Sequence, residues 1–208
     1  MTIRWAGTKP TAPIVGVEYS SEGRAALVMA DDSTLTYAVA GSDGTFAVLT
    51  PAPTQSFSPL VAWMNENRVI VLSTDNRQVS RLAVIDVAAR TMTAAGALSG
   101  VRVFAASADG KAVAAATEGA VYVAPIETFT GSRSPEPIVT LADRQVVWGL
   151  ALDGTGSRLF MLSGSIGGSG SIGDVHELGY TRQGSSWQKF LDSGVPFGRA
   201  VGQVFLAS

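Results

Sequence analysis

Residues 103–116 read VFAASADGKAVAAA, in which two short apolar runs flank a polar turn centred on Asp109 and Gly110. Apolar runs on both sides of a turn that contains Asp-Gly are typical of a β-hairpin. The phrase recurs in weaker form as VEYSSEGRAALV at residues 17–28, VAWMNENRVIVL at residues 61–72 and LALDGTGSRLFM at residues 150–161. The pattern predicts four hairpins, centred near residues 22, 66, 109 and 155.

The basic residue after each turn marks the period of this repeat. These residues are Arg24, Arg68, Lys111 and Arg158, so successive copies lie 44, 43 and 47 residues apart. A period in the forties, built from strands and turns, is typical of four-stranded propeller blades. The sequence therefore predicts an all-β fold, a small β-propeller of four to five blades that forms a single domain over residues 1–208.

Strand-like runs and turn residues place the four blades at approximately residues 14–51, 59–98, 101–141 and 146–193. Residues 187–191 suit either a fourth strand or one helical turn, and no helix of ordinary length is predicted. Two strand-like ends, residues 2–7 and 197–207, are left over. Because unpaired sheet edges attract other strands, we expect these ends to pair with each other and close a five-bladed ring, or to be completed by another subunit.

The hairpin phrase resembles the turn between the first two strands of WD40-like and YVTN-like propeller repeats, in which Ser-x-Asp-Gly-Lys/Arg is common. Residues 107–111, Ser-Ala-Asp-Gly-Lys, fit that pattern in full, whereas the other three copies depart from it and the Trp-Asp dipeptide is absent. The resemblance covers about residues 15–193. It implies the architecture, and no functional residue is carried over from it.

Composition excludes several classes of protein. Only 15% of the residues are charged, the net charge is −2 and no block of Lys and Arg occurs, so no nucleic-acid partner is expected. The absence of cysteine excludes disulfides, thiolate metal sites and cysteine nucleophiles. No apolar run approaches the length that would span a bilayer, so no membrane insertion is expected. Because Gly7, Pro10 and Pro13 interrupt any hydrophobic signal core, we expect cytoplasmic synthesis without a signal peptide.

Three patterns that carry chemistry in other proteins are weak here. Residues 168–173, GSGSIG, match G-x-G-x-x-G, but residues 174–180 alternate with a period of two and predict a strand where a dinucleotide site needs a helix. His176 is the only histidine, which excludes a zinc cluster of histidines and favours a packed or rim position. Turn carboxylates such as Asp109 and Asp153 are too few for a calcium loop and are expected to bond to their own turns. No catalytic residue, cofactor or metal is predicted.

Aromatic residues recur at one position of the repeat. Trp63 and Trp148 occupy equivalent places in the first strand of their copies, matched by Tyr19 and Phe104. Aromatic side chains bury large areas, so these four are expected in the core between blades.

The function expected from these features is that of a non-catalytic structural or protein-interaction module. Low charge, many small residues and unpaired ends suit a component of a large assembly such as a phage virion, with a protein partner or a homo-oligomer. The candidates for closure or partner contact are Trp5, Trp187, Phe197 and Phe205, of which Trp5 and Trp187 lie outside the repeated aromatic position. Two alternatives stay open: a propeller that binds a small ligand or glycan through rim aromatics, and a hydrolase or lyase with a site in the central channel.

Overall fold

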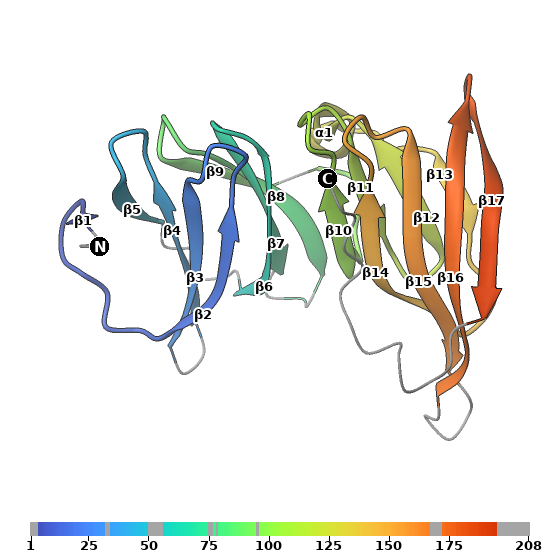
Figure 1. Ribbon diagram of the computed structural model, residues 1–208. Helices are drawn as coiled ribbons and strands as arrows, with labels where there is room; N and C mark the ends of the chain where they lie inside the picture. The colour runs from blue at the N-terminus through green and yellow to red at the C-terminus, as the bar shows by residue number, and fades with distance from the viewer. Residues whose placement is uncertain are drawn as a thin grey trace. The chain divides into compact units, whose positions relative to one another are not determined.

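A computed structural model describes residues 4–31, 34–49, 56–74, 77, 79–94, 96–166 and 172–194. In these residues the regular structure is almost entirely β, arranged as four sheets of four or five strands that follow one another along the chain (Figure 1). The chain divides into two compact units. Unit 1 comprises Met1–Ser99 and Phe129–Arg133, and unit 2 comprises Gly100–Thr128 and Ser134–Ser208.

Unit 1 contains two sheets. The first has the strand order β1-β5-β4-β3-β2, and the second has the order β6-β7-β8-β9. Neighbouring strands are antiparallel except β1 and β5, which are parallel. The strands of the first sheet are β1 (Arg4–Trp5), β2 (Ile14–Tyr19), β3 (Ala25–Asp31), β4 (Thr34–Ala40) and β5 (Thr45–Leu49). Those of the second are β6 (Ser56–Asn65), β7 (Arg68–Thr74), β8 (Ser80–Asp86) and β9 (Thr91–Ala94).

The two faces of the first sheet carry two different apolar clusters. The inner cluster joins residues of the first sheet, such as Val28 and Tyr37, to residues of the second, such as Val71 and Ile85. Side chains alternate between faces along a strand, so the intervening residues form a separate outer cluster: Leu27, Met29, Ala38, Ala40 and Phe46. The first sheet of unit 1 is therefore apolar on both sides, as expected of a blade packed on two faces.

Unit 2 repeats the plan with sheets ordered β10-β11-β12-β13 and β14-β15-β16-β17, all antiparallel. Its core cluster joins the two sheets through residues such as Ala114, Val121, Leu150 and Met161. The strands are β10 (Val103–Ala106), β11 (Val113–Ala116), β12 (Ala120–Ala124), β13 (Pro137–Thr140), β14 (Gln145–Leu152), β15 (Arg158–Ile166), β16 (Ile172–Gln183) and β17 (Ser186–Gly194).

The all-β prediction is confirmed, and hairpins join β2 to β3, β6 to β7, β10 to β11 and β14 to β15 at the four predicted positions. Residues 187–191 lie in strand β17, which decides between the two readings of that run. The short helix α1 (Ile126–Thr130) was not predicted, because five residues are too few to show a helical period. The division into two compact units does not test whether residues 1–208 form a single domain, which stays a prediction.

The partner of the N-terminal strand is a correction to the sequence analysis. Strand β1 pairs with β5 of the first sheet, Trp5 lies opposite Phe46, and the Ala6 amide donates to the Phe46 carbonyl at 2.8 Å. The expected partner was a C-terminal strand or another subunit. Residues 197–207, the C-terminal end proposed to close the ring, lie outside the described residues.

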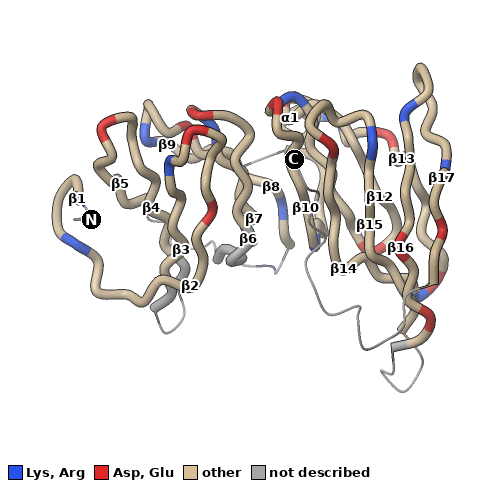
Figure 2. The backbone as a smooth tube through the Cα atoms, in the orientation of Figure 1, with Lys and Arg blue, Asp and Glu red and all other residues tan. Residues whose placement is uncertain are grey.

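Charged residues gather at turns and strand ends, and the central parts of most strands carry none (Figure 2). Strand β17 is an exception, because Lys189 and Asp192 lie within it. The few charged side chains therefore lie where they can interact with neighbouring turns. The functional candidates lie at these turns and on the exposed strands.

Candidate functional site

Strand β2 exposes an unusual amount of apolar side chain. It forms one edge of the first sheet, and Ile14, Val15, Val17 and Tyr19 are 48%, 51%, 46% and 65% exposed. Single exposed apolar residues are common on soluble proteins, but a contiguous group of them marks an interaction surface. Strand β2 is therefore the candidate site of unit 1.

The strand register places three of these side chains on one face of the first sheet. Val17 lies opposite Leu27 and Ile14 lies opposite Met29, and residues directly opposite each other share a face. Tyr19, two residues beyond Val17, projects to the same side. Because Leu27 and Met29 belong to the outer cluster, the exposed residues continue a buried apolar layer. We call Ile14, Val17 and Tyr19 the open face.

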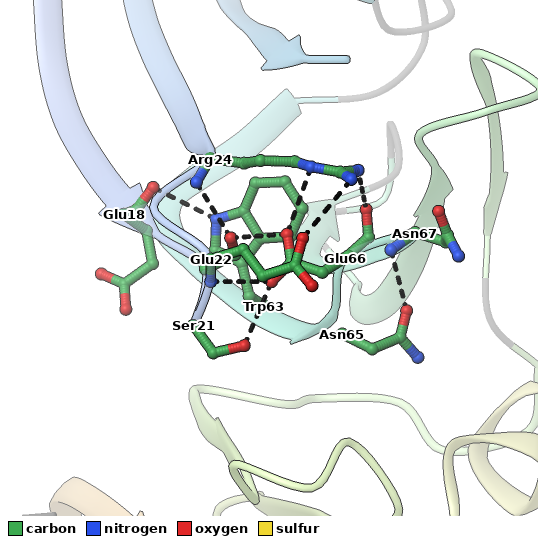
Figure 3. A network of polar contacts seen from close by, with 9 residues as sticks. Glu18, Ser21, Glu22, Arg24, Trp63, Asn65, Glu66 and Asn67 are labelled. Atoms are coloured by element: carbon green, nitrogen blue, oxygen red, sulfur yellow. Dashed lines mark hydrogen bonds and ion pairs between the residues drawn. The ribbon is translucent and has the colours of Figure 1, made fainter. Parts of the chain in front are cut away.

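A carboxylate from the second sheet holds the turn that follows β2 (Figure 3). Glu66 Oε2 accepts a hydrogen bond from Ser20 Oγ at 2.8 Å, and Oε1 accepts from Ser21 Oγ and from the Glu22 amide, both at 3.1 Å. Arg24 Nε lies 3.3 Å from Glu66 Oε2, and Arg24 Nη1 donates to the Glu66 carbonyl at 2.7 Å. The Glu66 side chain is only 17% exposed. This Glu66 network fixes the end of β2 against the second sheet.

The pKa values of two glutamates reflect their surroundings. Burial by itself would raise the pKa of Glu66, but hydrogen bonds from Ser20, the Glu22 amide and Ser21, together with the charge of Arg24, outweigh it and hold the pKa below its usual value. Burial raises the pKa of Glu18 on β2. Glu66 therefore serves as an ionised anchor, which is a structural role.

The prediction that the repeated aromatic residues lie in the core between blades is confirmed for Trp63 and wrong for Tyr19. Trp63 packs against the inner cluster, its indole donates to the Glu18 carbonyl at 3.1 Å, and Phe104 is buried. Trp148 is half-buried, with its ring close to Gly164. Tyr19 was expected in the core between blades, but it is exposed, because it projects to the open face and the second sheet covers the opposite face.

The candidates for partner contact lie in different surroundings. Trp5 packs against the outer cluster, with its ring centroid 5.5 Å from that of Phe46. Trp187 is half-buried in β17 and packs against the core of unit 2. Part of its side-chain surface is therefore already covered by residues of its own unit. Phe197 and Phe205 lie outside the described residues. A role for any of the four in closure or partner contact stays a prediction.

His176 has a partner that the sequence did not indicate. Its Nδ1 lies 2.8 Å from Asp192 Oδ1, and Lys189 Nζ donates to the other oxygen of the same carboxylate. The Lys189 hydrogen bond, followed by that of His176, lowers the pKa of Asp192, and Asp192 in turn raises the pKa of Lys189. In the described part of the chain no hydroxyl is hydrogen-bonded to His176. The arrangement is an exposed ion cluster that links β16 to β17, and it lacks the nucleophile that a histidine base would activate.

The carboxylates at the turns bond to their own backbone, as predicted. Asp109 accepts a hydrogen bond from the Lys111 amide at 3.1 Å, and Asp153 accepts from the amides of Ser157 and Arg158 at 2.7 and 3.0 Å. The strand predicted after the glycine-serine run is also confirmed, as β16. Among the described residues, no three His, Cys, Asp or Glu side chains gather as metal ligands would. None of the helices described there is long and apolar enough to cross a membrane.

Two of the cavities in the structure open on the described part of unit 2. The first, of about 660 Å³, lies between the ends of the two sheets and is lined by charged residues such as Arg102, Glu118 and Arg144 and by apolar residues such as Val146 and Ile166. The second, of about 550 Å³, is lined by residues that include Lys111, Arg182 and Trp187. Both have the size of small-molecule sites.

A protein-family model described as the lipoprotein LpqB beta-propeller domain matches residues 2–136. The chain belongs to this family. The match covers the whole of the first two sheets and most of the third, and it confirms the propeller architecture predicted from the repeat. A search of the curated proteins found no match.

Solved structures with this fold include enzymes and enzyme domains. Puromycin hydrolase aligns with a TM-score of 0.52 and 21% identity over 82% of this chain and 28% of its own. An oligogalacturonate lyase in complex with manganese aligns with a TM-score of 0.61 and 12% identity over 89% of this chain and 55% of its own. The β-propeller domain of the Trilobed protease from Pyrococcus furiosus aligns with a TM-score of 0.54 and 10% identity over 86% of this chain and 57% of its own. At these identities the likeness shows the fold alone.

The LpqB-type propeller thus has two features that sequence reasoning missed. The open face was missed because alternation along β2 shows which residues share a face, but not whether another sheet covers it. The Glu66 network was missed because Glu66 lies more than forty residues from the turn that it holds. A signal was present, since both turns belong to aligned copies of the repeat and adjacent blades bring such turns together.

Proposed function

We propose that this LpqB-type propeller is a non-catalytic module that associates with a further β-sheet through the open face of its first sheet. The observation that carries the proposal is the exposure of Ile14, Val17 and Tyr19 on the same face as the buried outer cluster. Apolar side chains at an exposed sheet edge favour pairing or stacking with another chain.

The occupant that fits this face is a second copy of the chain. Within each unit one sheet already packs on another through apolar faces, so sheet-on-sheet packing is the contact that these blades make. The open face carries no charge of its own, and two identical apolar patches can meet about a two-fold axis without opposing like charges. An interface of this kind is self-complementary.

Side-chain contacts support a non-catalytic role. The described carboxylates with lowered pKa values are engaged by turn amides, hydroxyls or cations, and His176 is paired with Asp192. Hydrolases and lyases share this fold, so an enzyme with a site in the central channel is the alternative. The fold likeness supplies no catalytic residue for it. Association with a virion remains an expectation from composition.

Sedimentation velocity from low to high micromolar concentration tests the proposal. We expect reversible self-association of the wild-type protein, and a double variant Val17→Thr/Tyr19→Thr should weaken it about tenfold or more. Threonine keeps the preference for a strand while removing apolar surface. Phe190→Ser is the matched control, because Phe190 is a 50% exposed aromatic on β17 of unit 2. Wild-type protein that stays monomeric throughout, or a control that weakens association equally, would overturn the proposal.

A further inference from the structure

The cavity of about 660 Å³ in unit 2 is lined by two arginines that are incompletely paired. Arg102 Nη2 lies 3.4 Å from Glu118 Oε2, and Arg144 Nε lies 3.9 Å from Asp143 Oδ2, the carboxylate next to it in sequence. Neither contact, among the described residues, is the two-bond pairing that a fully engaged guanidinium makes with a carboxylate. Both arginines therefore retain donors for a ligand.

The arginine side chains are less exposed than those of their carboxylate partners. The side chains of Arg102 and Arg144 are 53% and 64% exposed, whereas those of Glu118 and Asp143 are 84% and 97% exposed. Charges that are better shielded from water act more strongly on a ligand. Glu118 and Asp143 also line the cavity, so an anion would bind there through the unused donors of the two guanidinium groups and not through a net positive charge.

The backbone holds Arg144 in a conformation that glycine would normally supply. The Gln145 amide donates to the Ala142 carbonyl at 3.0 Å and closes a four-residue turn with Arg144 in third place. Arg144 has a φ of 59°, and in a turn of this kind that position usually holds glycine or asparagine. Residues kept in such conformations are enriched at ligand sites, although Arg90 has a similar φ of 55° and lines neither of the two cavities.

Hydrogen bonds to neighbouring residues hold the rest of the turn. Gln145 Nε2 donates to Ser163 Oγ at 2.8 Å, and its Oε1 accepts from the Ala142 amide at 3.0 Å. Ser163 is fully buried. The Ile166 amide donates to the Arg144 carbonyl at 2.9 Å, which ties the turn to the end of β15. Arg144 is thus presented from a fixed support beside the apolar side chains of Val146 and Ile166.

We propose that this cavity binds a small organic anion, with its carboxylate between Arg102 and Arg144 and a short apolar body against Val146 and Ile166. The site is independent of the open face, since every residue that carries it belongs to unit 2. It gives the chain a second binding function, toward a small molecule.

Titrations of ¹⁵N-labelled protein with hexanoate, hexanol and inorganic phosphate, followed by NMR, test the proposal. We expect saturable shifts of the Gly119 and Gln145 amides with hexanoate and none with hexanol. The variant Arg102→Gln/Arg144→Gly should weaken hexanoate binding about tenfold or more. Because glycine suits the positive φ at position 144, this variant should keep the wild-type melting temperature, so lost binding cannot be lost folding.

Arg158→Gln is the matched control, since it removes an exposed arginine of unit 2 that does not line this cavity. Its affinity for hexanoate should equal that of the wild type. The proposal is overturned if the shifts do not saturate, if the double variant binds as tightly as the wild type, or if phosphate binds as tightly as hexanoate.

Discussion

The two units build the same pair of adjacent hairpin turns with different contacts. In unit 1 the turns interact through side chains, because Glu66 binds Ser20, Ser21, the Glu22 amide and Arg24 of the other turn. In unit 2 each aspartate satisfies its own turn. The neighbouring turns there meet through the backbone, where the Asp109 amide donates to the Gly154 carbonyl at 3.0 Å, and through a close approach of Gly156 to Ala112.

This difference shows that one repeat can join its blades in two ways. The turn of residues 107–111 is the complete Ser-x-Asp-Gly-Lys form and needs no outside partner, because Asp109 accepts from Ser107 Oγ and the Lys111 amide. The turn of residues 20–24 has no aspartate, and Glu66 supplies the missing acceptor from the next sheet. Unit 1 should therefore depend on a polar network, and unit 2 on close packing of small residues.

The largest effect is expected where the adjacent turns of unit 2 pack closely. A Cβ on Gly156 would lie 2.5 Å from Ala112 Cβ, and Gly156 has a φ of 69°. Replacing Gly156 with Val should therefore lower the free energy of unfolding by about 3 kcal/mol or more, through combined steric overlap and backbone strain. Urea denaturation measures this loss of unfolding free energy.

Gly154→Ala is the control for this variant, because a Cβ at Gly154 meets nothing within 4 Å and no positive φ is recorded there. It should change the free energy of unfolding by no more than about 0.5 kcal/mol. Equal effects of the two variants would contradict the close-packing account of unit 2.

The next effect is expected in the polar network of unit 1. Replacing Glu66 with Ala removes acceptors from Ser20 and the Glu22 amide and leaves Arg24 without its carboxylate, so we expect a loss of about 2 kcal/mol. Glu22→Ala is the control from the same network, because the Glu22 side chain is 68% exposed and lies 3.7 Å from Arg24. A loss in the control as large as that of Glu66→Ala would show that the network does not centre on Glu66.

The self-contained turn of unit 2 should be less sensitive. Asp153→Asn keeps one acceptor oxygen for the amides of Ser157 and Arg158 but loses the charge, so a loss of about 1 kcal/mol is expected. Asp143→Asn, at a carboxylate that is 97% exposed, should have almost no effect. Combining Asp153→Asn with Glu66→Ala should give additive losses, since the two sites lie in different units. Losses that are far from additive would contradict the comparison between the turns of unit 1 and those of unit 2.

The pH dependence of stability sharpens the contrast further. The pKa of Glu66 is lowered in the folded state, so its contribution is present in full above its ordinary value of 4.5 and is lost as the pH falls through the lowered pKa. We expect the difference in unfolding free energy between wild type and Glu66→Gln to shrink as the pH falls below about 4.5. A difference that grew on acidification would contradict the lowered pKa.

The smallest effect is expected at His176. The cluster of His176, Asp192 and Lys189 is exposed, and exposed ion pairs contribute little. His176→Gln should leave the melting temperature and hexanoate binding unchanged. A large change in either would show that the histidine has a role beyond linking two strands.

Local sequence was a good guide to the hairpins and a poor one to their surroundings. Asp109 and Asp153 could be assigned to their turns, because the acceptor and its donors lie within five residues. Tyr19 was misplaced, because its equivalence to Trp63 says nothing about whether a sheet covers each residue. Arg144 gave no signal at all, since a positive φ at an arginine can be seen only in the folded backbone.

The sequence by itself determined the all-β class, the period of the repeat, the positions of the four hairpins and the bonding of the turn aspartates. These features follow from the alternation of apolar and polar residues along strands and from the residue types that turns require, and both act over a few residues. Only the tertiary structure decided that β1 pairs with β5, that Glu66 anchors the turn after β2, that one face of the first sheet is open, and that Arg102 and Arg144 wall one cavity. Each of these depends on which strands lie side by side and in what register, a choice made by packing between residues far apart in the chain.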